Sequence, residues 1–169
     1  LVNPGHNRVY FEESKKLSVS ELQIILPRMS VECSEVKAIH LADVFYLSFC
    51  CDKSLNNRDI GILSKLSFVY AIFEMKEINS DKMLLPIARN NVQYMDSNIS
   101  SILKYTGKTN EIFTRMMINV ALFTSDYIDA PTIKMLDPIS GKCTTLFEGL
   151  VCGFDVYGIE ISDKAVNET

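Results

Sequence analysis

The chain lacks any long hydrophobic run, although 47% of its 169 residues are hydrophobic. No run approaches the roughly 20 apolar residues that a membrane-spanning helix needs. The first residues also lack the basic and then apolar pattern of a signal peptide. A net charge of only −4 and an ordinary apolar fraction argue against disorder. We therefore expect a cytoplasmic globular protein without membrane contact.

Cysteine and histidine are too few and too scattered for a metal centre. The five cysteines are an odd number and include no CxxC pair, and the two histidines are far apart. We therefore expect neither a zinc site nor a disulfide framework. The adjacent Cys50 and Cys51 are predicted to be small core residues on a strand.

A strongly basic region is also missing. Residues 1–110 carry a net charge of +1 and residues 111–169 a net charge of −5. Neither part has the clearly basic face that is typical of nucleic-acid binding. Bulk charge therefore does not indicate an RNA partner.

The first half of the chain alternates strand and helix signals. Residues 8–12 are aromatic and β-branched, which predicts a strand. Ser18 precedes Glu21 at capping-box spacing, which predicts a helix that ends near Pro27.

Two further strands are predicted over 36–40 and 44–51, with a turn at 42–43 between them. A helix over 60–66, capped by Asn56 or Asn57, and a last strand over 68–74 follow. The resulting order is strand-helix-strand-strand-helix-strand, which is typical of a ferredoxin-like α+β module. We assign this module to residues 1–95.

The middle of the chain has weaker signals. Residues 77–100 read as a linker with a short strand over 83–87, and a short helix is predicted near 99–103. A strongly apolar helix over 111–124 follows, capped by Thr109 or Asn110. Its apolar face is predicted to hold Ile112, Met116, Val120 and Phe123.

Residues 132–161 predict a strand-turn-helix-strand unit of the parallel, doubly wound type. Its parts are a strand over 133–136, a tight turn over 140–142, a helix over 144–152 and a strand over 155–159. Gly153 is well placed to end the helix.

Two acids flank this unit, because Asp137 ends the first strand and Glu160 follows the second. Their separation of 23 residues is close to the roughly 20 expected for an acid that binds ribose hydroxyls. The glycine pattern is not G-x-G-x-x-G, and an acid beside the turn would repel phosphates. A cationic cofactor without phosphates suits the turn better, which points to S-adenosylmethionine.

The same residues resemble a known family. Residues 137–144, DPISGKCT, resemble the first motif of class I S-adenosylmethionine-dependent methyltransferases, in the D-P-x-C-G-x-G-T form of THUMP-linked RNA methylases. Residues 158–160, GIE, resemble their second motif. Residues 104–115, KYTGKTNEIFTR, are similar to the lead-in helix of tRNA guanine-N2 methyltransferase relatives.

This resemblance implies that residues 96–169 are the first β-α-β part of a Rossmann-like methyltransferase domain. It implies S-adenosylmethionine as cofactor and RNA, in particular tRNA methylated at guanine N2, as partner. The implied cofactor-binding residues are Asp137, Pro138, Ser140, Gly141, Glu160 and Ile161.

The sequence departs from the family in three respects. Ser140 stands where a cysteine is common, and Cys143 stands where the second glycine is expected, so a Cβ there should strain the turn. No Pro-Pro occurs, so the N/D-P-P-Y/F acceptor motif is missing and no catalytic residue is assigned. We therefore expect an N-terminal fragment that is inactive alone and that self-associates through its incomplete sheet or the 111–124 helix.

Other interpretations stay open. Cys143 favours a non-catalytic RNA-binding or assembly module with a degenerate cofactor loop, and the target of a methyltransferase could be DNA or a small molecule. Lys104, Lys108 and Arg115 are either RNA phosphate contacts or ordinary surface charges, with the latter favoured.

Overall fold

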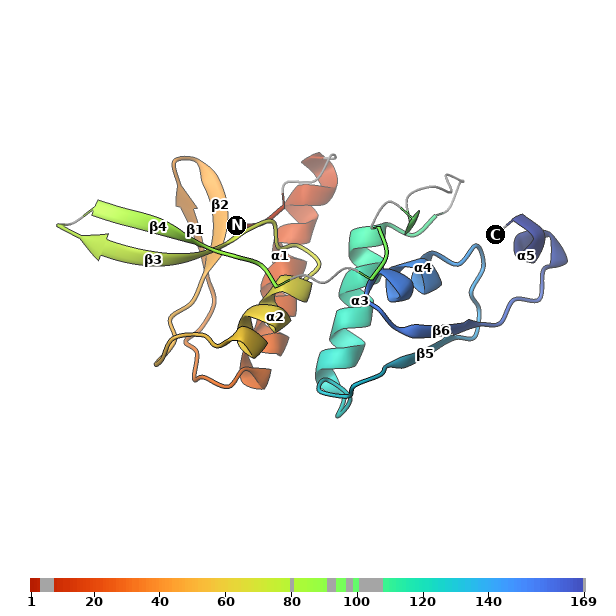
Figure 1. Ribbon diagram of the computed structural model, residues 1–169. Helices are drawn as coiled ribbons and strands as arrows, with labels where there is room; N and C mark the ends of the chain where they lie inside the picture. Colours follow the sequence, from red (N-terminus) through yellow and green to blue (C-terminus); the bar gives the residue numbers. More distant parts are fainter. Residues whose placement is uncertain (4–7, 80, 91–93, 97–98, 101–107, 169) are drawn as a thin grey trace. The chain divides into compact units, whose positions relative to one another are not determined.

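The computed structural model describes residues 1–3, 8–79, 81–90, 94–96, 99–100 and 108–168. The chain divides into two units, Leu1–Asn91 and Val92–Thr169, whereas the sequence suggested a boundary after residue 95. Figure 1 shows the elements of each unit. Among the described helices, none combines the length and apolar character that crossing a bilayer requires.

The described residues of the first unit form two α-helices, a short 3-10 helix and two β-hairpins (Figure 1). In chain order they are α1 (Arg8–Ile25), the 3-10 helix η1 (Leu26–Arg28), β1 (Lys37–Leu41), β2 (Val44–Ser48), α2 (Asn57–Lys65), β3 (Ile72–Ile78) and β4 (Asp81–Ile87). Both hairpins are antiparallel and each forms its own two-stranded sheet.

Local sequence explains the β1–β2 hairpin and the start of α2. Ala42 and Asp43 both have positive φ, 49° and 61°, as a two-residue turn that matches strand twist requires. The side chain of Asn56 accepts a hydrogen bond from the backbone N–H of Asp59, and the Asp59 carboxylate accepts one from the backbone N–H of Asn56. This capping box confirms the predicted helix and selects Asn56 as its cap.

The core of this unit is made by both helices, the β1–β2 hairpin and the connecting loops. Its buried apolar side chains include Leu22, Ile25, Leu26, Met29, Val36, Phe45, Ile62, Leu63, Leu66 and Phe68. The β3–β4 hairpin extends away from the helices and is mostly exposed (Figure 1). This hairpin therefore contributes little to the core.

The predicted strand over residues 8–12 is wrong, because these residues begin α1. Aromatic and β-branched residues favour strands only weakly, and a helix that buries Leu22 and Ile25 overrides that preference. Ser18 is therefore not a cap. It lies inside the helix, where its hydroxyl donates to the Ser14 carbonyl oxygen at 2.8 Å.

The order of the first unit departs from the predicted ferredoxin-like order. The strand predicted over 68–74 begins only at Ile72, as β3, while Val69 forms only an isolated bridge with Val2. The predicted linker over 77–100 is wrong at its start, because β3 and β4 extend to residue 87. The short strand predicted within it, over 83–87, is confirmed and begins two residues earlier, at Asp81. In the described residues the four strands of this unit form two separate hairpins, whereas a ferredoxin-like module needs one sheet.

The second unit contains α3 (Glu111–Thr124), β5 (Lys134–Asp137), α4 (Thr144–Val151), β6 (Asp155–Gly158) and α5 (Asp163–Glu168). Strands β5 and β6 are parallel, with Met135 opposite Val156 and Asp137 opposite Gly158. The predicted strand-turn-helix-strand unit is therefore confirmed. The predicted bounds of the 111–124 helix also match α3, and the side chain of Asn110 caps it.

The buried face of α3 differs from the prediction. Its buried residues are Thr114, Ile118, Asn119, Leu122 and Phe123, whereas Ile112 is exposed. Of the predicted face only Phe123 is fully buried. Thr114 can be buried because its hydroxyl donates to the Asn110 carbonyl oxygen at 3.0 Å. The short helix predicted near 99–103 lies mostly outside the described residues.

Two glycines let α4 pack closely on the parallel pair. A Cβ at Gly149 would clash with the Met135 side chain and lie 2.8 Å from Cγ1 of Val156. A Cβ at Gly158 would lie 2.5 Å from Cδ1 of Leu146. One face of the β5–β6 pair is therefore covered by α4.

Candidate cofactor site

The two acids singled out from the sequence lie at the same edge of the parallel pair. Asp137 is the last residue of β5, and Glu160 follows the end of β6. The backbone N–H of Ile159 donates to the Asp137 carbonyl oxygen at 2.9 Å, which extends the ladder to the end of both strands. Because parallel strands end at the same edge, this places the turn after β5 beside the segment after β6.

Ser140 ties the turn to that segment. Its backbone N–H donates to the Ile159 carbonyl oxygen at 2.9 Å, and its hydroxyl donates to the same oxygen at 3.2 Å. The side chain is buried, and its Oγ and Cβ lie 3.0 and 3.1 Å from the position that a Cβ at Gly158 would take. Ser140 therefore holds the turn in place rather than facing an open crevice.

Glu160 is bound by the backbone of both segments. Its Oε2 accepts from the backbone N–H of Gly141 at 2.8 Å, and its Oε1 accepts from the backbone N–H of Ser162 at 2.7 Å. A carboxylate has about four acceptor positions. These two bonds therefore leave Glu160 acceptor capacity for hydroxyl groups of a ligand.

The remaining predicted residues are more open. Asp137 is half-buried, and its Oδ1 accepts from the backbone N–H of Ile139 at 3.1 Å. Pro138 is exposed, and the Ile161 side chain is 99% exposed. Gly141 has a φ of +52°, and nothing lies within 4 Å of the position that its Cβ would take. This part of the edge is therefore accessible to a ligand.

Cys143 adopts a backbone conformation that favours glycine. Its φ is 63°, in the left-handed region, and it immediately precedes α4. Its N–H donates to the Ser140 carbonyl oxygen at 2.8 Å, which closes the turn, and its own carbonyl accepts from Phe147 at 2.9 Å. A non-glycine residue in this region costs about 1–2 kcal/mol. The expected strain at Cys143 is therefore present in the backbone.

An apolar groove reaches Asp137 and Pro138 from the side of α3. It has a volume of about 780 Å³, and its lining includes Met117, Leu122, Leu136, Thr145 and Phe154. That volume falls within the roughly 300–1,000 Å³ of small-molecule sites.

The cations considered for RNA contact are engaged within the unit. The Arg115 guanidinium binds the Glu148 carboxylate through Nε at 2.8 Å and a terminal nitrogen at 2.7 Å. Lys108 binds the Glu111 carboxylate at 2.6 Å and also the Ser100 carbonyl oxygen. Lys104 lies outside the described residues. Neither Arg115 nor Lys108 is therefore a simple surface charge.

The Lys108 contact is also seen in the acidity of its partner. Burial raises the pKa of Glu111, but the hydrogen bond from Lys108, a backbone hydrogen bond and the charge of Lys108 together outweigh it, so the pKa lies below the ordinary value. This effect stabilises the charged carboxylate in the first turn of α3, where the helix dipole also favours a negative charge.

The sequence alone did not predict the buried Arg115–Glu148 pair. Glu148 lies on α4 at helical spacing from Thr144 and Val151, and all three are buried. An acid on the buried stripe of a helix needs a cationic partner, since an unpaired buried charge is very costly. That requirement was the signal in the sequence, and α3 supplies the partner.

No metal centre is found among the described residues, since they contain no group of three or more His, Cys, Asp or Glu side chains placed to hold an ion. Compared with protein-family models, curated proteins and solved structures, the chain shows no match.

Proposed function

We propose that the β5–α4–β6 unit binds S-adenosylmethionine as the first portion of a class I methyltransferase domain. The observation that carries the proposal is that Asp137 and Glu160 flank one turn at the carboxyl edge of two parallel strands. Ligands of open α/β sheets bind at this edge.

The chemistry of the turn favours this cofactor over a dinucleotide. The turn presents carboxylates, which attract the sulfonium and ammonium groups of S-adenosylmethionine and repel a pyrophosphate. Glu160 retains acceptor positions for the ribose hydroxyls, and the open space at Gly141 allows close approach. Ile161 offers an exposed apolar side chain for the adenine.

The proposed substrate is RNA, in particular guanine N2 of tRNA, in the cytoplasm. It is supported by the resemblance of residues 104–115 to tRNA guanine-N2 methyltransferase relatives. When bound, S-adenosylmethionine would supply an electrophilic methyl group. The N/D-P-P-Y/F motif that orients the target amine in this family is not in the sequence. The chain would therefore contribute cofactor binding, and we expect no methyl transfer to tRNA by this chain alone.

Calorimetric titration of the whole chain with S-adenosylmethionine tests the proposal. Saturable binding is expected, and Asp137→Asn or Glu160→Gln should weaken it by about tenfold or more, because each removes a charged acceptor. Asp155→Asn is the matched control, since Asp155 is an exposed acid at the opposite end of β6. Absence of binding, or equal weakening by the control, would contradict the proposal.

A second candidate is a non-catalytic module with a degenerate cofactor loop. The observation that favours it is the left-handed conformation of Cys143, at the position of a family glycine. The variant Cys143→Gly separates the two candidates. Binding that is already present in the natural chain supports the first, and binding that appears only in the variant supports the second.

A further inference from the structure

Cys33 and Cys51 face each other across an isolated antiparallel bridge in the first unit. Their Sγ atoms are 3.2 Å apart, and neither cysteine is in a disulfide. We call these two residues the cysteine pair. Neither lies on a named strand, and the neighbouring Cys50, predicted to be a core residue, is exposed.

The register of the bridge brings the two side chains together. The backbone N–H of Ser34 donates to the Cys50 carbonyl oxygen at 2.8 Å, and that of Asp52 donates to the Glu32 carbonyl oxygen at 3.0 Å. These bonds flank the cysteine pair. The backbone groups of Cys33 and Cys51 therefore do not bond to each other, which makes the two residues a non-hydrogen-bonded pair of the antiparallel ladder. Cα atoms of such a pair are about 4.5 Å apart, within the range that a disulfide spans.

Side chains reinforce this register on both sides of the pair. The Asp52 carboxylate accepts from the backbone N–H of Glu32 at 2.9 Å, and the Ser34 hydroxyl accepts from the backbone N–H of Cys50 at 2.8 Å. The two thiols are thus held in contact by four hydrogen bonds that do not involve sulfur.

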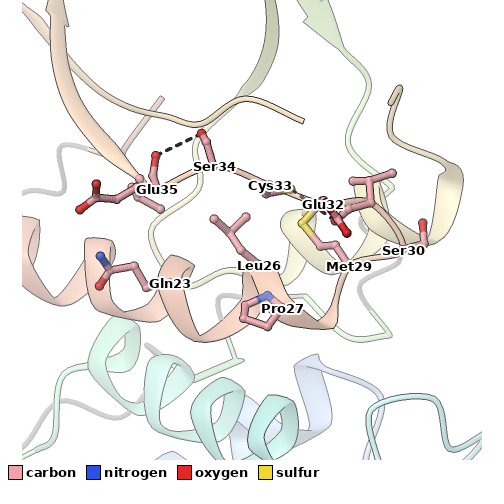
Figure 2. Close-up of a pocket in the computed structure, with 11 residues that line it drawn as sticks. Gln23, Leu26, Pro27, Met29, Ser30, Glu32, Cys33, Ser34 and Glu35 are labelled. Carbon is pink, nitrogen blue, oxygen red and sulfur yellow. Dashed lines mark hydrogen bonds between the residues drawn. The ribbon is translucent and has the colours of Figure 1, made fainter. Parts of the chain in front are cut away.

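Both cysteines are half-buried, but only Cys33 borders a cavity. Cys33 lines a cavity of about 570 Å³ formed by residues 23, 26–27 and 29–36, and Figure 2 shows it in the loop between Glu32 and Ser34. Cys51 is half-buried and is not part of the lining. A small reagent that enters this cavity would therefore meet Cys33 first.

We propose that the cysteine pair is a thiol modification site that closes to an intramolecular disulfide by exchange with a small-molecule disulfide such as oxidised glutathione. The Cys33 thiolate attacks one sulfur of the reagent and expels one thiolate. The Cys51 sulfur then attacks Cys33 Sγ, gives up its proton and expels the second thiol. Two protein thiols are oxidised, and the reagent is reduced to two thiols.

The order of the two steps follows from the surroundings of Cys51. Burial first, and then the hydrogen bond to Cys33, raise the pKa of Cys51 to about 12. The Cys51 thiol therefore keeps its proton near neutral pH and is a poor first nucleophile. It acts as the resolving thiol once Cys33 carries the mixed disulfide, because the two sulfurs are already in contact.

The test treats the whole chain with oxidised glutathione, alkylates the remaining thiols and maps the peptides by mass spectrometry. We expect a chain without intermolecular disulfides that loses two of its five alkylatable thiols and yields a cross-link between Cys33 and Cys51. Cys33→Ser and Cys51→Ser should each abolish the cross-link. Cys50→Ser is the matched control and should keep it.

A cross-link through Cys50, or a glutathione adduct on Cys33 that never resolves, would overturn the proposal. Thermal unfolding gives a second measurement on the natural chain. Closing this loop should raise the Tm of the oxidised chain by about 10 °C, reversibly with dithiothreitol. An unchanged or lower Tm would show that the fold does not accommodate the bond, and would also overturn the proposal.

Discussion

At the residue scale, Cys143 occupies a backbone conformation that a glycine would adopt without strain. Its φ of 63° lies in the left-handed region, and it immediately precedes the first residue of α4. The Cys143 N–H completes the turn by bonding to Ser140, so the chain cannot relax there without losing that bond. The strain is therefore held in place by the surrounding turn.

We expect Cys143→Gly to raise the free energy of unfolding by about 1 kcal/mol, because it removes the left-handed penalty. Cys152→Gly is the matched control, since Cys152 at the end of α4 has a φ of −76°. There the change should lower stability by about 0.5–1 kcal/mol. Urea unfolding of the three chains measures both signs, and a less stable Cys143→Gly chain would contradict the first.

Asp59 is a buried acid that stabilises the first unit through hydrogen bonds. It is 0% exposed and accepts from the Ser30 backbone N–H at 2.8 Å and the Ser30 hydroxyl at 2.6 Å. Burial raises its pKa, but these bonds, the backbone N–H of Asn56 and the charge of Arg58 together hold the pKa below the ordinary 3.8.

A pH dependence follows from this lowered pKa. A carboxyl that is more acidic in the folded chain stabilises it fully above the unfolded value and loses that effect as pH falls through the folded value. Asp59→Asn should therefore cost about 1–3 kcal/mol near pH 6, and the difference from the natural chain should shrink below about pH 4. Unfolding free energies from pH 6 to 3 measure this, with the exposed Asp81→Asn as control. A gap that stays constant to pH 3 would contradict the argument.

At the element scale, the structure agrees with the sequence where local signals set the boundaries. Asn110 and Asn56, each one of two predicted candidates, cap α3 and α2, and Ala42 and Asp43 form the predicted turn. Gly153 follows α4 with a φ of +80°, as the predicted stop. Caps and turns depend on a few neighbouring residues, so a single sequence reveals them.

The failures occur where tertiary context decides. Residues 8–12 have strand-type side chains but continue into α1. The strand predicted over 83–87 is present in β4, but its first two residues, Asp81 and Lys82, are charged and were assigned to the linker. In the candidate site, both acids were found at the predicted edge. The sequence did not predict the Glu160–Gly141 contact or the Glu148–Arg115 pair, because both join residues far apart in sequence.

Close helix–sheet packing makes a prediction at this scale. Gly149→Ala should destabilise the second unit by about 1–3 kcal/mol, because its Cβ would overlap Met135 and Val156. Gly61→Ala is the matched control in α2, where nothing lies within 4 Å of the added Cβ. It should stabilise the chain by about 0.5–1 kcal/mol. Thermal unfolding of both variants checks the opposite signs, and a neutral Gly149→Ala would contradict the packing argument.

At the scale of the whole molecule, the second unit exposes apolar side chains on its short sheet. Leu136 of β5 and Tyr157 of β6 are opposite each other and are 59% and 55% exposed. Parallel sheets are ordinarily covered on both faces. These side chains alternate with Met135 and Val156, which lie against α4.

We therefore expect the chain to self-associate as its concentration rises, with Leu136→Lys and Tyr157→Lys shifting the equilibrium towards the monomer. The lysines add charge to the exposed apolar surface without altering the side that faces α4. Light scattering over a concentration series measures the mass. A strict monomer at high concentration for the natural chain would contradict the expectation.

The bonds from Gly141 and Ser162 to Glu160 shape the turn before any ligand arrives. A ligand that binds the Glu160 carboxylate must share it with these two amides. Ligand binding should therefore alter the conformation of the turn as far as Cys143. The half-buried thiol of Cys143 then serves as a built-in reporter, and its alkylation rate should change when the edge is filled. Alkylation of this natural thiol would thus report ligand binding without an introduced cysteine.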